Sequence, residues 1–219
     1  MPHDRVIIQP NGLNESERAA LAAAMQPVAR RLQQKEICFV GMWGLRKGSR
    51  DWPEIVRQIR SKMPEVKFKF LGTMVSKEMV LTDLGVSESE GIFCLGKFDR
   101  NELPNLLSGC AVGLFPSYIE GFGLSVIEQL AAGIPTIAYD VPGPRQIFTD
   151  KGWAFLVPMG DVGAMVESAL EVLRMSESEY SVLSEASRRI ADTFRWEKIA
   201  ADTVHEYQVA LEQMTNPPG

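Results

Sequence analysis

Two glutamates flank a glycine-containing turn in the segment Pro116–Pro135, and they are the first residues whose types and spacing indicate chemistry. Glu120 and Glu128 are eight positions apart, and Gly121 and Gly123 lie between them. Glycines let a backbone approach a ligand closely, and the N-terminus of the helix expected after them offers unpaired N–H groups to an anion. Carboxylates accept hydrogen bonds from hydroxyl groups. The pattern therefore indicates a site for a diphosphate that carries hydroxyl-rich groups, such as a ribose and a hexose.

Each glutamate also has a plainer interpretation. The helix is expected to begin near Leu124 or Ser125, so Glu128 taken alone is a favourable charge in the early turns of a helix. Glu120 taken alone is a solvated loop acid. The combination of both acids with the glycines, rather than either residue, favours a binding site.

A sheet must position this turn, because short apolar runs alternate with amphipathic stretches along the chain. Trp52, Ile55, Val56 and Ile59 have the i, i+3, i+4, i+7 spacing of a helix with one buried face. The pattern predicts an α/β fold, a doubly wound, Rossmann-like parallel sheet with helices on both faces, whose ligands bind at the carboxyl ends of the strands. The expected strands are residues 6–9, 36–41, 66–72, 92–98, 111–117, 134–140 and 154–158.

One of these runs alternates strictly. Phe68 and Phe70 fall on one face of the run 66–72, and Lys67 and Lys69 fall on the other. Such alternation is typical of a half-exposed strand, so it predicts that this strand lies at an edge of the sheet.

The remainder of the chain is expected to be helical. After Pro158 the strand pattern stops, and amphipathic spacing predicts helices at 162–175, 179–194 and 196–214. The fold class is therefore a single α/β domain with a helical C-terminus.

The composition excludes several classes of function. The chain has 219 residues, of which 45% are hydrophobic and 23% charged, and a net charge of −5, which fits one globular domain without a basic face for nucleic acid. Cys38, Cys94 and Cys110 lie in apolar runs and are expected to be reduced core thiols. Neither a membrane-spanning run nor a signal-peptide pattern is recognisable, so a cytoplasmic location is expected.

The segment Pro116–Pro135 resembles the E-x7-E signature of retaining GT-B glycosyltransferases of the group 1, or family 4, type. Three other segments resemble the same family in order. Val6–Asn14 is similar to the segment that leads into the donor domain, Phe39–Ser49 to the first strand and phosphate loop, and Phe194–Leu211 to the closing helix. The resemblance implies that residues 1–219 are one nucleotide-sugar-binding domain, the C-terminal half of a GT-B enzyme, and that the acceptor domain is absent.

The resemblance also implies roles for individual residues. Lys47, otherwise a solvated loop lysine, would contact the diphosphate and act in catalysis with Glu120. Glu120 would hold the donor sugar together with the backbone N–H groups of the next turn, and Glu128 would accept from the ribose hydroxyls. The residues implied for donor binding are Gly41, Arg46, Lys97, Phe98, Phe122, Gly123, Leu124, Ser125 and Glu128, with Lys97 and Phe98 near the nucleobase. Phe98 fits a plain packing role equally well.

Two positions depart from the family pattern. Met42 stands where an arginine usually follows the glycine of the first strand, and Arg46 lies beside Lys47 rather than at that position. Loss of a bidentate phosphate donor would weaken the stabilisation of the leaving group. Gln146 stands where an acidic residue is commoner.

The expected activity is hexosyl transfer from a nucleotide sugar to an acceptor, with retention at the anomeric carbon. No D-x-D pair occurs in the sequence, so neither a metal nor another cofactor is expected. The isolated chain is expected to be inactive. The full-length enzyme is expected to be cytoplasmic or attached peripherally to the membrane. An exposed interdomain face is expected to cause weak self-association.

Other functions fit the residues less well. A nicotinamide-dependent oxidoreductase requires G-x-G-x-x-G, whereas Gly41, Gly44 and Gly48 are spaced by three and four. The order of GLRKGS does not match a P-loop either. Closer alternatives keep the fold: a GT-B epimerase or phosphorylase relative, or a non-catalytic sugar-nucleotide-binding module. An interaction protein that docks a partner on its C-terminal helices also stays open.

Overall fold

The centre of the molecule is a six-stranded, wholly parallel sheet. A computed structural model describes residues 7–87, 91–148 and 155–215, and its strand order is β3-β2-β1-β4-β5-β6. The order reverses between β1 and β4, which creates the point where open α/β sheets bind ligands. The strands are β1 (Glu36–Val40), β2 (Lys67–Leu71), β3 (Ile92–Leu95), β4 (Cys110–Phe115), β5 (Thr136–Tyr139) and β6 (Leu156–Val157).

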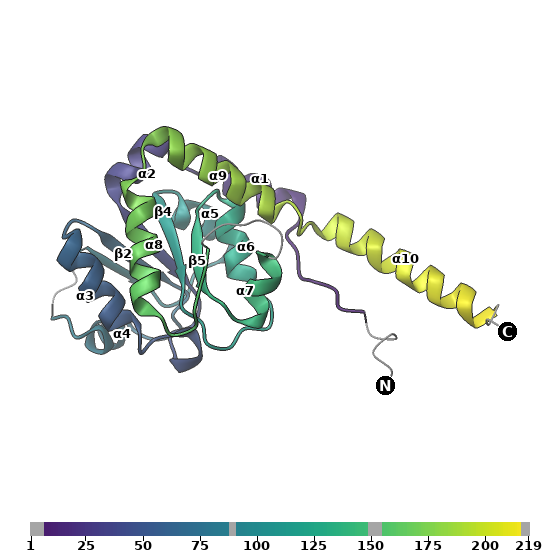
Figure 1. Ribbon diagram of the computed structural model, residues 1–219, viewed down its shortest axis with the longest axis horizontal. Coiled ribbons are helices and arrows are strands. Elements are labelled where there is room, and N and C mark those ends of the chain that lie inside the picture. The colour runs from purple at the N-terminus through teal and green to yellow at the C-terminus, as the bar shows by residue number, and fades with distance from the viewer. Residues whose placement is uncertain (1–6, 88–90, 149–154, 216–219) are drawn as a thin grey trace.

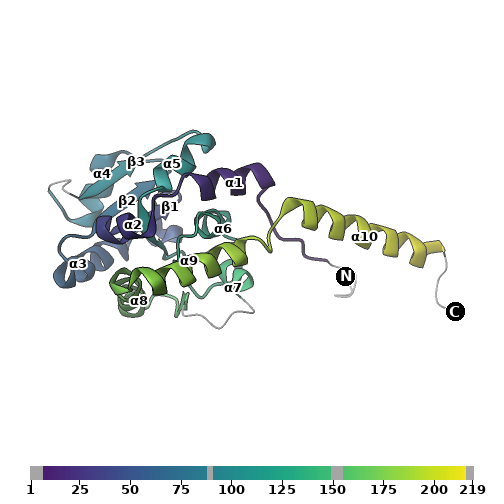
Figure 2. The same cartoon turned by 90° about the horizontal axis from the view of Figure 1, so that it is seen from above.

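Helices cover both faces of this sheet (Figures 1 and 2). Crossovers between parallel strands are right-handed, so the reversal of strand order places the helices before and after β3 on opposite faces. One layer comprises α3 (Trp52–Lys62), α4 (Lys77–Leu84) and α8 (Val162–Arg174). The other comprises α1 (Glu15–Ala23), α2 (Val28–Gln34), α5 (Leu103–Leu107), α6 (Leu124–Ala131) and α9 (Glu177–Ala191). The doubly wound architecture predicted from the sequence is confirmed.

The predicted buried stripe of α3 is also confirmed. Trp52, Ile55, Val56 and Ile59 are all buried, and the Trp52 ring packs edge-on against Phe70 of β2 with ring centroids 4.8 Å apart. Strand β4 is buried along its whole length, as expected for the middle of a sheet covered on both faces. Two of the three free cysteines are buried and Cys94 is partly exposed.

The prediction that β2 is an edge strand is wrong, because β2 lies between β1 and β3. Its alternation is real, with Phe68 and Phe70 buried and Lys67 exposed. The face of β2 that carries the lysines can lie inside the sheet because Lys69 has polar partners. Its Nζ lies 2.9 Å from Glu36 Oε2 and donates to the Leu106 carbonyl at 3.0 Å.

The expected first strand at residues 6–9 does not form. Val6 lies outside the described residues, and Ile7 and Ile8 are exposed in an extended segment that belongs to no strand in the described part of the chain. The pairing occurs further on, where the Leu13 N–H donates to the Phe194 carbonyl at 2.9 Å and the Trp196 N–H donates to the Leu13 carbonyl at 3.2 Å. Leu13 and Arg195 form an isolated parallel bridge.

The C-terminal helices appear as predicted, within a few residues. α8 and α9 pack on the domain, whereas α10 (Trp196–Thr215) extends away from it (Figures 1 and 2). Val204, Tyr207 and Leu211 are exposed along α10. Within residues 7–87, 91–148 and 155–215, no helix combines the length and the apolar character needed to cross a membrane.

Candidate functional site

Two loops meet at the carboxyl ends of β1 and β4, where the strand order reverses. The first contains the 3-10 helix η2 (Leu45–Lys47), and the second comprises residues 116–123. The Arg46 carbonyl accepts hydrogen bonds from the Tyr118 N–H at 2.8 Å and from the Ser117 hydroxyl at 3.1 Å. Arg46 therefore connects the two loops through its backbone carbonyl, while its side chain is exposed.

Gly48 permits the close approach of these loops. Its φ is +80°, and a Cβ atom at this position would lie 2.1 Å from the Pro116 carbonyl oxygen. Such a contact is impossible without moving one loop. Gly44, in the same loop, has an extended φ of 174° and nothing within 4 Å of the equivalent position. Of these two glycines, Gly48 is the one that the geometry requires.

Lys47 and Glu120 form a hydrogen-bonded ion pair between the two loops. Their side chains are only 17% and 16% exposed, and Lys47 Nζ lies 5.0 Å from the centroid of the Phe115 ring. The structure thus brings together the two residues that the sequence resemblance singles out for catalysis. A partly desolvated ammonium group beside a carboxylate is suited to exchange that carboxylate for a phosphate.

The N-terminus of α6 lies next to this pair. Gly123 is its N-cap residue, with φ +105° and no side-chain cap, so the first N–H groups of the helix are available to an anion. Glu120, residues 121–124 and Gln146 line a cavity of about 630 Å³ together with residues 8–11. Of the residues predicted for donor binding, Phe122, Gly123 and Leu124 therefore share one cavity with Glu120.

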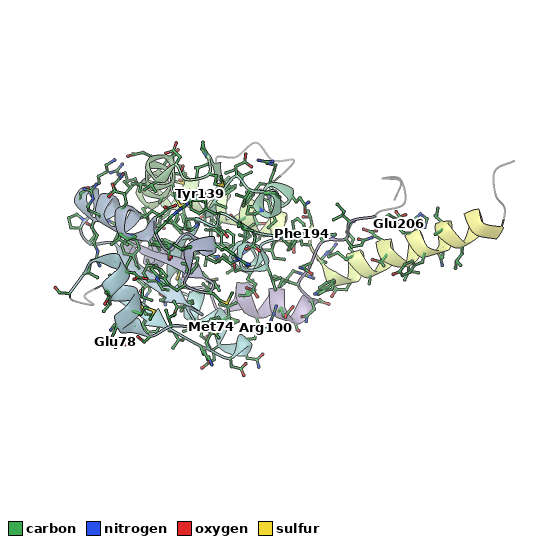
Figure 3. All side chains as sticks on the ribbon, turned by 90° about the horizontal axis from the view of Figure 1, so that it is seen from below. Met74, Glu78, Arg100, Tyr139, Phe194 and Glu206 are labelled. Carbon is green, nitrogen blue, oxygen red and sulfur yellow. The ribbon has the colours of Figure 1, made fainter. Side chains whose placement is uncertain are left out.

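A carboxylate at the start of α3 and two tyrosines link α3 to the second loop and to the end of β5. Asp51 Oδ2 accepts from the Tyr118 hydroxyl at 2.8 Å and from the Tyr139 hydroxyl at 2.7 Å. Burial and the hydrogen bond to Asp51 raise the pKa of both phenols, so both remain donors. Figure 3 shows Tyr139 within the body of the domain. The sequence analysis missed this cluster, although Asp51 directly precedes the helix that begins after the Lys47 loop.

Glu128 does not face the cavity lined by Glu120. It is only 7% exposed and lines a second cavity, of about 290 Å³, between α6, α1 and α5. Burial raises the pKa of its carboxyl group to about 7, although Arg100 opposes this rise. Arg100 Nη2 lies 3.2 Å from Glu128 Oε1. The plainer interpretation of Glu128, a favourable charge in the early turns of a helix, does not account for this burial.

The other predicted residues, Gly41, Lys97, Phe98 and Ser125, line neither of these two cavities. Gly41 follows β1 and donates its N–H to the Leu71 carbonyl at 2.9 Å. Lys97 is exposed, and Phe98 is half-buried with its ring against Gly72. Ser125 is half-buried in the first turn of α6.

The two residues that depart from the family pattern are both exposed. Met42 is exposed beside Trp43, and Gln146 is exposed on α7 (Pro142–Ile147) at the first cavity. In the described part of the chain, no group of three or more His, Cys, Asp or Glu residues could hold a metal ion. The expectation that no metal takes part stays a prediction.

Known proteins resemble the chain in sequence and in fold. It is 28% identical over 145 residues to the MMP alpha-(1->4)-mannosyltransferase of Mycolicibacterium hassiacum, covering 63% of this chain and 33% of that protein. It is also 28% identical over 201 residues to the D-inositol 3-phosphate glycosyltransferase of Mycobacterium bovis, covering 89% of this chain and 40% of that protein. The chain thus spans about a third to two fifths of these curated relatives.

Solved structures share the fold. HepE of Anabaena, solved in complex with UDP and glucose, superposes with a TM-score of 0.70 at 17% sequence identity, over 92% of this chain and 56% of that one. The family model described as glycosyl transferases group 1 matches residues 22–190. This range includes Lys47, Glu120 and Glu128. The chain therefore belongs to the group 1 glycosyl transferases, and its Rossmann-like α/β fold matches one half of solved GT-B glycosyltransferases.

Proposed function

We propose that the chain is the nucleotide-sugar-binding domain of a retaining hexosyltransferase, and that it forms the C-terminal half of a two-domain GT-B enzyme. The observation that carries this proposal is the meeting of Lys47, Glu120 and the uncapped N-terminus of α6 at the reversal of strand order. Donors for a diphosphate and an acceptor for sugar hydroxyls converge there. The UDP and glucose bound by HepE support a nucleoside-diphosphate sugar as the ligand class.

In this proposal the donor replaces an internal contact. Its diphosphate lies at the α6 N-terminus, and Lys47 exchanges Glu120 for a phosphate oxygen. Glu120 is then released to accept from a hydroxyl group of the sugar. Glu128 accepts from the ribose, and the base lies near Lys97 and Phe98.

The same groups would stabilise the transition state. When the bond between the anomeric carbon and the diphosphate breaks, negative charge develops on the leaving oxygen, where Lys47 and the α6 N–H groups oppose it. No metal is needed for this step. The acceptor must bind against a second domain, so we expect no sugar transfer by this chain alone.

A binding experiment tests the proposal. We expect UDP, GDP or ADP, but not NAD, to raise the melting temperature, because a ligand bound only by the folded state stabilises it by about 2.7 kcal/mol at 100 times its dissociation constant. Lys47→Met should weaken binding at least tenfold by calorimetry. Lys62→Met is the control, because it removes a lysine that pairs with a glutamate, Glu167, on a more exposed part of the surface. If all three diphosphates leave the melting temperature unchanged, the proposal fails.

A non-catalytic sugar-nucleotide-binding module is the second candidate, favoured by Met42. Under this alternative the chain binds a diphosphate, but a longer protein that contains it transfers no sugar. Met42→Arg would then strengthen diphosphate binding, because the exposed position lies beside the phosphate loop. An epimerase relative would instead convert a nucleotide sugar without an acceptor, and a phosphorylase relative would cleave a glycosidic bond with inorganic phosphate.

A further inference from the structure

Three charged side chains from three elements meet at the wall of the 290 Å³ cavity. Glu128 comes from α6, Arg100 from the 3-10 helix η3 (Arg100–Glu102) and Glu17 from α1. Arg100 Nε lies 2.9 Å from Glu17 Oε1, and Arg100 Nη2 lies 3.2 Å from Glu128 Oε1. One guanidinium group therefore bridges two carboxylates. Figure 3 shows Arg100 beside α1.

Local structure fixes both partners of Glu128. Glu17 belongs to a capping box: its carboxylate accepts from the Asn14 N–H at 2.9 Å, while the Asn14 side chain accepts from the Glu17 N–H at 2.8 Å. Arg100 follows Asp99, which caps η3 in the same reciprocal manner with Glu102. The backbones that carry Glu17 and Arg100 are thus held at two capped helix ends.

These partners act on Glu128 in opposite directions. Burial raises the pKa of the Glu128 carboxyl group to about 7, Arg100 lowers this pKa, and Glu17 raises it. The other side chains that line the cavity are uncharged. Helix α9 also packs on α6, and its Arg188 lies against Gly133, two residues past the C-terminal end of that helix.

We propose that Arg100 and Glu17 are positioning residues of the nucleoside site, which set the charge of Glu128 and thereby the pH range in which a ribose diol binds. The inference rests on the proposed function, in which Glu128 accepts from the ribose hydroxyls. An ionised carboxylate is the stronger acceptor, and it can use both oxygens. Arg100 holds Oε1, which leaves Oε2 to the ribose.

The charge of Glu128 can be measured without a ligand. We expect the carboxyl ¹³C signal of Glu128 in the wild-type protein to titrate near neutral pH, and the signal to be assigned by its loss in Glu128→Gln. Arg100→Met should move the midpoint up and Glu17→Gln should move it down. Arg100→Lys should keep it near the wild-type value. Arg57→Met, which removes another exposed arginine paired with a glutamate, should leave it unchanged.

The pH dependence of ligand binding should shift in the same direction as the Glu128 midpoint in each variant. With whichever of UDP, GDP or ADP binds most tightly, we expect Arg100→Met to bind at least roughly threefold more weakly than wild type at pH 7 and equally at pH 9, because one pKa unit is a tenfold change in proton affinity. Glu17→Gln should keep its affinity to lower pH than wild type. The pH profile of Glu128→Gln gives the titration of the ligand's own phosphate, which is common to all variants.

The outcomes separate the inference from the proposed function. If no diphosphate binds the wild-type protein at any pH, the proposed function fails. If a diphosphate binds, but Arg100→Met and Glu17→Gln leave the Glu128 midpoint and the pH profile unchanged or move them in the same direction, the inference is overturned. A general loss of structure would move both variants together, whereas opposite shifts require the charges themselves.

Discussion

Glu128 is charged at neutral pH only at a cost to the stability of the fold. Its pKa is about 7 in the folded protein against an ordinary 4.5, so the folded state binds the proton more tightly than the unfolded chain. The contribution of this group to stability is therefore fully present below about pH 4.5, declines as pH rises toward 7, and is lost above it. The difference corresponds to roughly 3 kcal/mol.

Substitution of this acid by its neutral isostere should therefore stabilise the empty protein. We expect Glu128→Gln to raise the free energy of unfolding by about 1–3 kcal/mol at pH 8 and by little at pH 4.5, where the wild-type carboxyl group is largely protonated. Urea unfolding at the two pH values checks this. Glu185→Gln, on the exposed side of α9, controls for the loss of one charge. Equal stability of wild type and Glu128→Gln at pH 8 would contradict the burial argument.

Single residues of the site could be identified from the sequence, but not their neighbours. Lys47 and Glu120 were predicted as a catalytic pair and lie in contact, although their roles stay predictions. Arg100 was missed, because its significance arises from two elements that approach it from distant parts of the chain. A sequence displays spacing within one segment, whereas the burial of Glu128 depends on α1 and α5 packing beside α6.

At the scale of elements, the site depends on how closely two loops approach each other. We expect Gly48→Ala to destabilise the fold by on the order of 2–4 kcal/mol, since its Cβ would overlap the Pro116 carbonyl and φ is positive. It should also weaken diphosphate binding, because the loop that carries Lys47 must move.

The same loop provides the control for this substitution. Gly44→Ala should change stability by less than about 0.5 kcal/mol, because its extended backbone suits any residue and the space around it is open. Chemical denaturation and calorimetry measure both effects. A Gly48→Ala variant as stable as Gly44→Ala would mean that the two loops do not meet as described.

The elements themselves were largely predictable, and the errors have physical causes. The apolar stripe of α3 predicts correctly which face of this helix is buried, because the helical spacing of apolar residues is visible within one segment of the sequence. The alternation of β2 suggested an edge because two lysines share a face, but the ion pair of Lys69 with Glu36 keeps that face inside the sheet. Ile7 and Ile8 are apolar enough for a strand, yet a strand also needs a neighbouring backbone, which a sequence does not reveal.

At the scale of the whole molecule, α10 presents an apolar stripe to solvent. Val204, Tyr207 and Leu211 are spaced by three and four residues and are exposed, with Tyr207 at 67%. Figure 3 shows Glu206 on the same projecting helix. Such a stripe favours association, because contact between two copies would bury it.

We therefore expect weak, concentration-dependent self-association in sedimentation, in the range of roughly 0.1–1 mM, which a small apolar contact would support. Tyr207→Lys combined with Leu211→Lys should abolish it. Val182→Lys, which removes an isolated exposed apolar residue from α9, should not. A strictly monomeric wild-type protein at millimolar concentration would refute the prediction.

The short parallel pairing of Leu13 with Arg195 gives the fold a mechanical property. Its hydrogen bonds join the extended segment that leads into the domain to the start of α10. Tension applied through residues 7 and 215 would shear this pairing along its length before any load reached the ladder of the central sheet. The domain would therefore first lengthen by releasing the two outer segments. This release would remove residues 8–11 from the wall of the first cavity and Leu13 from the wall of the second, while the sheet stays intact.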